Sequence, residues 1–174
     1  MNSRYILQQG INFVVYLLLQ IFIVRNLVVF DVAFCFVYVA FLLLLPIEAA
    51  TITAMLLGFA TGLTVDVFYN TFGIHAAACV FIMYVRKYWI DALTPRGGYD
   101  LGSVPSPIAM GFSWFATYAI PLTLVHHAII FFIEFGGFDL FYYTSVKVLA
   151  STAFTFILVT VIQYIIHTPR RTVL

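Results

Sequence analysis

The sequence predicts an all-α integral membrane protein, a bundle of six transmembrane helices with both termini in the cytoplasm. Of its 174 residues, 64% are hydrophobic and only 9% are charged, and the mean hydropathy is +1.07. A soluble domain is roughly half apolar and a quarter charged, so a water-soluble globule is excluded. The charged residues also separate apolar runs that are long enough to cross a bilayer, which takes about 20 residues per helix.

The first three spans are expected at residues 5–24, 27–45 and 47–69. The first run lies between Arg4 and Arg25 and is too long for the core of a signal peptide, so we expect it to be retained. The second contains Asp31 near its start, at headgroup level, and ends at Pro46. Pro46 and Glu48 then suit the first turn of the third helix, so helices two and three should form a tight hairpin.

The remaining spans are expected at residues 73–90, 108–133 and 140–167. Between the fourth and fifth lies the one substantial loop, residues 94–107, which contains three prolines and three glycines and can be neither a span nor a regular strand. Pro121 should kink the fifth helix. Six spans leave no room for a soluble domain, so the whole chain, 1–174, is expected to be one membrane domain.

The distribution of basic residues predicts the orientation. With both termini in the cytoplasm, six of the eight basic residues lie on the cytoplasmic side and only Arg25 and Lys147 lie outside. This agrees with the positive-inside rule, and it places the loop 94–107 in the cytoplasm. The net charge of +1 gives no reason to expect nucleic acid as a partner.

Polar residues four positions apart form stripes on the first and last helices. Residues with this spacing stack on one helix face, and polar faces avoid lipid, so each stripe should point into the bundle. The stripes either form hydrogen bonds between helices or line a polar cavity. Their members are Gln8, Asn12 and Gln20 on the first helix, and Ser151, Thr155 and Gln163 on the last.

The third helix carries a different stripe, made of the small residues Ala54, Gly58 and Gly62. Small residues at this spacing let another backbone approach closely, either that of a neighbouring helix of the same chain or that of a partner's transmembrane helix. Three polar residues, Asp66, Asn70 and His75, follow around the outer turn. They are expected to form a hydrogen-bonded latch that fixes this turn, with a ligand or proton site as the alternative.

Nothing in the sequence predicts a catalytic or metal site. His127 and Glu134 stand about 10 Å apart along a helix, which is too far for one metal, and no HExxH motif is present. We expect the pair His126 and His127 to lie at the membrane interface. Neither a nucleophile motif, a phosphate loop nor a dinucleotide fingerprint occurs. The chain is therefore expected to be no enzyme and to need no cofactor or metal.

The order of motifs in residues 58–78 resembles one known family. Gly58 and Gly62 precede Leu63 and Asp66, and a short turn leads to Gly73 and His75 in the sequence GIHAAA. This pattern is similar to the core of rod shape-determining membrane proteins of the MreD family. Residues Arg96, Gly97, Gly98 and Tyr99 of the loop and the pair His126 and His127 also look similar to some members.

The resemblance implies a non-catalytic subunit of the cell-wall elongation machinery in the bacterial inner membrane. Its partners would be membrane lipid, a bitopic membrane protein of the MreC type, the actin-like MreB filament, and a shape-determining glycosyltransferase and transpeptidase. The loop 94–107 would face the cytoplasmic partners. The family fold is also similar to the substrate-binding subunits of energy-coupling-factor transporters, so the alternative function is that of a small-molecule-binding subunit of a vitamin-type transporter.

Overall fold

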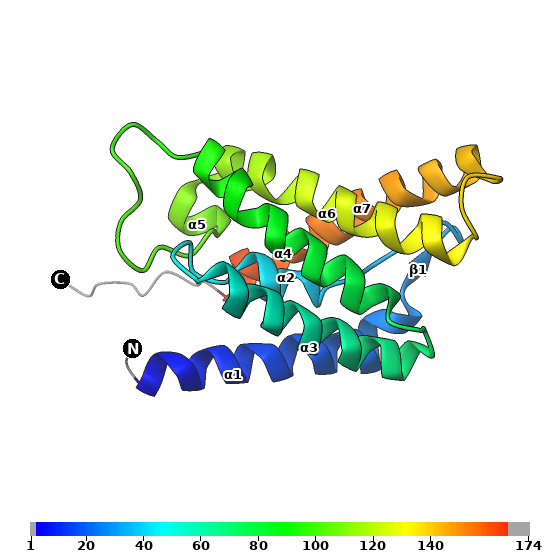
Figure 1. Cartoon of the computed structure of the whole chain (residues 1–174), viewed down its shortest axis with the longest axis horizontal. Helices are drawn as coiled ribbons and strands as arrows, with labels where there is room; N and C mark the ends of the chain where they lie inside the picture. Colours follow the sequence, from blue (N-terminus) through cyan, green and yellow to red (C-terminus); the bar gives the residue numbers. More distant parts are fainter. Residues whose placement is uncertain (1–2, 167–174) are drawn as a thin grey trace.

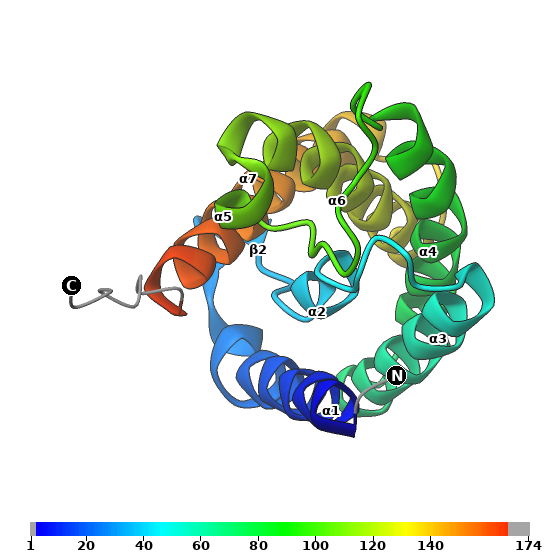
Figure 2. The same cartoon turned by 90° about the vertical axis from the view of Figure 1, so that its left-hand side faces the viewer.

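A computed structural model describes residues 3–166, with the side chains of residues 3–6 and 8 left undescribed. Within this range five helices have at least 16 residues and run along the long axis of the molecule (Figure 1). Seen end-on, they form a ring around the short helix α2, Val39–Leu43 (Figure 2). The five are α1 (Ser3–Leu18), α3 (Thr51–Tyr69), α4 (Ile74–Ala92), α6 (Phe112–Glu134) and α7 (Phe141–Ile166).

Four helical stretches are long and apolar enough to cross a membrane, which identifies the chain as a helical membrane protein. They are Gln9–Asn26, Thr51–Tyr69, Phe112–Glu134 and Phe141–Ile166. Helix α4 has a comparable length of 19 residues, but Arg86, Lys87 and Asp91 lie in its last two turns. The count of six spans and their orientation stay predictions.

Helix α7 directs its polar side chains inward and large apolar side chains outward. On α7, Ser151 is fully buried and Thr155 is 1% exposed, whereas Leu149 and Ile165 are 61% and 70% exposed. A surface of bulky apolar side chains that is this exposed suits contact with lipid. The polar stripe predicted for the last helix therefore faces the interior.

Residues 27–45 do not form the continuous second helix that the sequence predicts. They begin with a short antiparallel hairpin of β1 (Val28–Val29) and β2 (Ala33–Phe34), in which Val28 pairs with Phe34. Its turn carries positive φ at Phe30 and Asp31, and Val32 N donates to Val29 O at 3.2 Å. The chain continues without regular structure through residues 35–36, enters a turn at 37–38 and becomes helical in α2.

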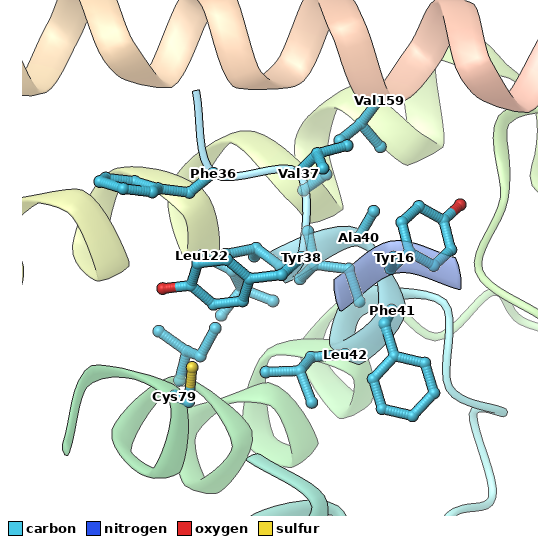
Figure 3. Close-up of a cluster of buried hydrophobic side chains, with 14 of the residues drawn as sticks. Tyr16, Phe36, Val37, Tyr38, Ala40, Phe41, Leu42, Cys79, Leu122 and Val159 are labelled. Carbon is cyan, nitrogen blue, oxygen red and sulfur yellow. The ribbon is translucent and has the colours of Figure 1, made fainter. Parts of the chain in front are cut away.

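The segment 35–43 fills the centre of the ring. Every side chain from Val37 to Leu43 is at most 3% exposed. Figure 3 shows this segment surrounded by Tyr16 of α1, Cys79 of α4 and Leu122 of α6, with Val159 of α7 above it. An apolar run that is buried on all sides gains stability from packing whether it is helical or extended, so its apolar composition alone does not select a helix.

Several helix ends differ from the predicted spans. Helix α3 begins at Thr51, so Pro46 and Glu48 belong to the preceding turn and not to its first turn. The predicted span 108–133 is divided at Gly111, whose φ of 85° separates α5 (Pro107–Met110) from α6. Pro121 lies within α6. Helix α1 continues as a π-helix, Leu19–Ile23, and a 3-10 turn, Val24–Asn26.

Candidate functional site

The segment 35–38 places non-helical peptide groups in the core, and Gln20 satisfies two of them. Its amide Nε2 donates to Cys35 O at 3.1 Å and to Tyr69 Oη at 2.6 Å, while its Oε1 accepts from Tyr38 N at 3.4 Å. Gln20 is fully buried and lies in the π-helix that follows α1. Because a bilayer core offers no water, non-helical backbone at this depth needs such partners from the protein.

Side chains of helix α7 also accept hydrogen bonds from backbone amides of this segment. Phe34 N donates to Ser151 Oγ at 2.9 Å, and Phe36 N donates to Thr155 Oγ1 at 3.1 Å. The sequence left two roles open for these stripes, hydrogen bonds between helices or a polar cavity. Gln20 and Thr155 form bonds between helices as predicted, to Tyr69 of α3 and to His127 of α6. Together with Ser151 they also bond to backbone groups of one unwound segment, a role that the sequence did not predict.

The other stripe residues behave differently. Gln163 Nε2 donates to Tyr16 Oη at 2.9 Å, a hydrogen bond between α7 and α1 of the kind predicted. Asn12 is half-buried on α1. Gln8 was predicted to belong to the same stripe, but its side chain lies outside the described residues.

The hydroxyl of the fully buried Tyr38 joins the central segment to helices α4 and α6. Tyr38 Oη lies 2.8 Å from His75 Nδ1 of α4 and 2.9 Å from His126 Nε2 of α6. His126 Nδ1 is buried without a hydrogen-bond partner among the described residues. An unpaired acceptor costs less than an unpaired N–H, so we assign His126 Nε2–H as donor to Tyr38 and Tyr38 as donor to His75.

His127 continues this network toward α7. Its Nδ1 donates to Thr123 O at 2.7 Å, which leaves Nε2 to accept from the Thr155 hydroxyl at 3.1 Å. Both His126 and His127 are fully buried among the helices, and their expected place at the level of the membrane interface stays a prediction. Their adjacent positions on one helix direct the two rings to different neighbours, His126 to Tyr38 and His127 to Thr123 and Thr155.

Asp66 holds the turn between α3 and α4. Its Oδ1 accepts from His75 N at 3.0 Å and from Thr71 Oγ1 at 2.5 Å, and its Oδ2 accepts from Ala76 N at 2.9 Å. The carboxylate thus caps the free amides at the start of α4. His75 takes part through its backbone and not its ring. Asn70 contributes only its left-handed backbone, φ 57°, at the end of α3. The side chain that bonds to Asp66 in this turn is that of Thr71, which the sequence analysis did not include.

The small-residue stripe of α3 packs against α4 of the same chain. Ala54 is 2% exposed. A Cβ built on Gly58 would lie 3.1 Å from Cys79 O, and one built on Gly62 would lie 2.5 Å from Ala76 N. The contact at Gly58 would be tight, whereas real Cβ atoms essentially never come as close to backbone as at position 62, so Gly62 is the residue that lets α3 and α4 approach closely enough for Asp66 to reach the amides of α4. The alternative role, contact with a partner's helix, would require the hairpin to open.

An apolar groove of about 570 Å³ lies on the outer side of the same helix pair. Its floor includes Gly73, Ala76 and Ala77, and larger side chains form its walls. Among the residues that line it are Met55, Phe59 and Leu63 of α3, and Val80, Phe81 and Tyr84 of α4. No charged residue lines this groove, so it faces lipid or another apolar surface.

The loop 94–107 folds back on the end of the bundle. Arg96, Gly97 and Gly98 are exposed at its tip, where Gly98 has a φ of 77° and its N donates to Pro95 O at 2.9 Å. Tyr99 turns inward, donates to Ile90 O at 3.2 Å and packs edge-on against Trp114. Of the four loop residues predicted to contact partners, the structure presents the first three to solvent.

Sequence reasoning missed Tyr38 and Arg86. Tyr38 stands in an apolar run in which nothing distinguishes it from a lipid-facing tyrosine. Arg86 looked like a charge at the exit of the fourth helix, but it is only 2% exposed. Its Nε donates to Tyr118 Oη at 2.8 Å and its Nη2 donates to the carbonyls of Leu45 and Pro46. The one sequence feature that could have indicated a buried Arg86 was Tyr118, its hydrogen-bond partner on α6.

No group of three or more potential metal ligands occurs among the described residues. Comparisons with protein-family models, with curated proteins and with solved structures find no match to this chain. The arguments about function therefore rest on the residues and their geometry.

Proposed function

We propose that the chain is a non-catalytic membrane scaffold of the bacterial cell-wall elongation complex, which binds the transmembrane helix of a bitopic partner of the MreC type. In this proposal the chain crosses the inner membrane six times, with residues 27–45 as the one unwound crossing. The motif order in residues 58–78 supports the family. The outer groove of α3 and α4 is the observation that carries the binding function.

The groove has the properties that a helix-binding surface needs in lipid. Helix association there is driven by close packing, which small residues permit, and not by the hydrophobic effect. Gly73, Ala76 and Ala77 provide such a floor, and the exposed ring of Phe59 provides a wall. Because no charge lines the groove, its occupant must be apolar along the contact. A single transmembrane helix meets these conditions.

Packing of the core argues against the alternative of a vitamin transporter subunit. The centre of the helix ring holds residues 37–43, all nearly inaccessible (Figure 3). A small molecule bound there would have to displace this segment and its hydrogen bonds to Gln20 and Thr155. In the scaffold proposal the exposed tip at Arg96 would contact the MreB filament, and the glycosyltransferase and transpeptidase would join through the bitopic partner.

The test fills the groove without touching the core. Ala77 is exposed and lines the groove, whereas Ala60 is exposed on α3 outside it. Ala77→Trp should abolish co-purification of the MreC-type protein from native membranes in mild detergent, and Ala60→Trp should not. A cysteine at position 77 should also form a disulfide with a cysteine in the partner's transmembrane segment. Unchanged co-purification with Ala77→Trp, together with no cross-link, would refute the proposal.

A further inference from the structure

A second, hydrophilic pocket of about 300 Å³ lies at the end of the bundle where α3 begins and α4 ends. Ala50 and Thr51 at the start of α3 form one wall, and Arg86 and Lys87 of α4 form another. Tyr99, whose hydroxyl is bonded to Ile90 O, adds a side from the loop. Four charged residues, Glu48, Arg86, Lys87 and Asp91, are among those that line it.

Arg86 is a buried cation with no anion from the protein beside it. It is 98% buried, and the sole ion pair among the described residues joins Lys87 to Asp91 at 3.0 Å. Its Nε and Nη2 bond to neutral oxygens, while Nη1, the remaining end of the guanidinium, has no hydrogen bond within residues 3–166. Buried charges are almost always paired, because desolvation of a lone ion is costly. The missing counter-charge is therefore expected from a ligand.

The start of α3 adds further donors on the facing wall. Its N-cap is Ala50, which has no side-chain oxygen to accept from the first amides, and the first intrahelical bond is that of Ala54 N to Ala50 O. The amides of residues 51–53 thus lack helical acceptors at the positive end of a 19-residue helix.

Two carboxylates also line the pocket, and both are engaged. Asp91 is paired with Lys87, and Glu48 Oε1 accepts from Gly102 N at 3.2 Å. Neither lies within ion-pair distance of Arg86. Arg86 Nη1 and the first amides of α3 are therefore the donors beside this pocket for which the described residues supply no acceptor.

We propose that this pocket binds a phosphate group, held by Arg86 and by the amides at the start of α3. A guanidinium and a helix N-terminus are complementary to the several oxygens and the charge of phosphate. The phosphate can belong to a lipid headgroup or be free in solution, and both sources share this chemistry. The inference is independent of the partner helix, since the apolar groove lies on a different surface of α3 and α4.

The test introduces a carboxylate of the chain itself into the pocket, where it would compete with phosphate for Arg86. Ala50→Asp adds a carboxylate to the pocket and also a good N-cap, so the variant should remain folded. Ala50→Asn is the matched control, with the same shape and capping but no charge. Unfolding of the purified chain in maltoside micelles is followed against inorganic phosphate, dihexanoyl phosphatidylglycerol, dihexanoylglycerol and sodium chloride of equal ionic strength. Stabilisation that rises with ligand concentration gives Kd by linkage.

We expect one or both phosphate probes to stabilise the wild type, and Ala50→Asp to raise their Kd at least tenfold, against less than threefold for Ala50→Asn. Stabilisation by both probes would identify phosphate itself as sufficient, and stabilisation by the lipid alone would identify a headgroup. Equal stabilisation by dihexanoylglycerol or sodium chloride, or equal Kd values for the two variants, would overturn the proposal. Thr51→Glu, which also adds a carboxylate to the first turn of α3, provides the second variant if Ala50→Asp fails to fold.

Discussion

Replacement of Gln20 by leucine tests whether side chains on the helices hold the unwound segment in place. Leucine nearly matches glutamine in volume but offers neither donor nor acceptor, so Gln20→Leu leaves Cys35 O and Tyr38 N without partners in the core. Each buried polar group left unpaired costs about 1–3 kcal/mol. The variant should therefore lose about 2–6 kcal/mol of unfolding free energy, provided that no water enters.

The measurement is unfolding of the purified protein in maltoside micelles by added dodecyl sulfate, followed by circular dichroism. Asn12→Leu is the control, since it makes a comparable change on the same stripe, two turns earlier, at a half-buried position. Its effect should stay within about 0.5 kcal/mol. If Gln20→Leu is as stable as Asn12→Leu, the segment does not depend on this side chain and the account of the core is wrong.

Four further substitutions address the network and the packing of the helices. Tyr38→Phe leaves His75 Nδ1 without its partner and leaves His126 Nε2 with only Cys79 Sγ at 3.8 Å, so it should cost about 1–3 kcal/mol in the same assay; no loss would show that the hydroxyl does not join the helices. Gly62→Ala should destabilise by about 1–3 kcal/mol through its clash with α4, whereas Gly10→Ala, which meets nothing, should stabilise by about 0.5–1 kcal/mol; the opposite order would contradict the packing. Asp66→Asn removes one charged acceptor and should lower the melting temperature, by an amount equivalent to about 1–3 kcal/mol, and an unchanged melting temperature would rule out the cap.

Composition and periodicity were sufficient for the class of protein and for most of its helices. A chain with 9% charged residues must lie in lipid, and lipid requires that backbone groups be satisfied within the protein. The same requirement turns polar side chains inward, which is why the faces of Ser151 and Gln163 could be predicted from their spacing. Helices α3, α4 and α7 accordingly begin and end within a few residues of the expected spans.

The path of residues 27–45 depends on contacts that no local pattern contains. An apolar run satisfies its peptide groups most simply as a helix, although the many valines and aromatic residues between Val28 and Val39 favour extended structure. The non-helical form is stable because Gln20, 15 residues before Cys35, and Thr155, 119 residues after Phe36, bring donors and acceptors to its backbone. Burial of Arg86 and of the histidines follows from the same ring of helices, since each side chain finds its partners on a different element. Local sequence thus specifies which groups need partners, and long-range packing decides which groups those partners are.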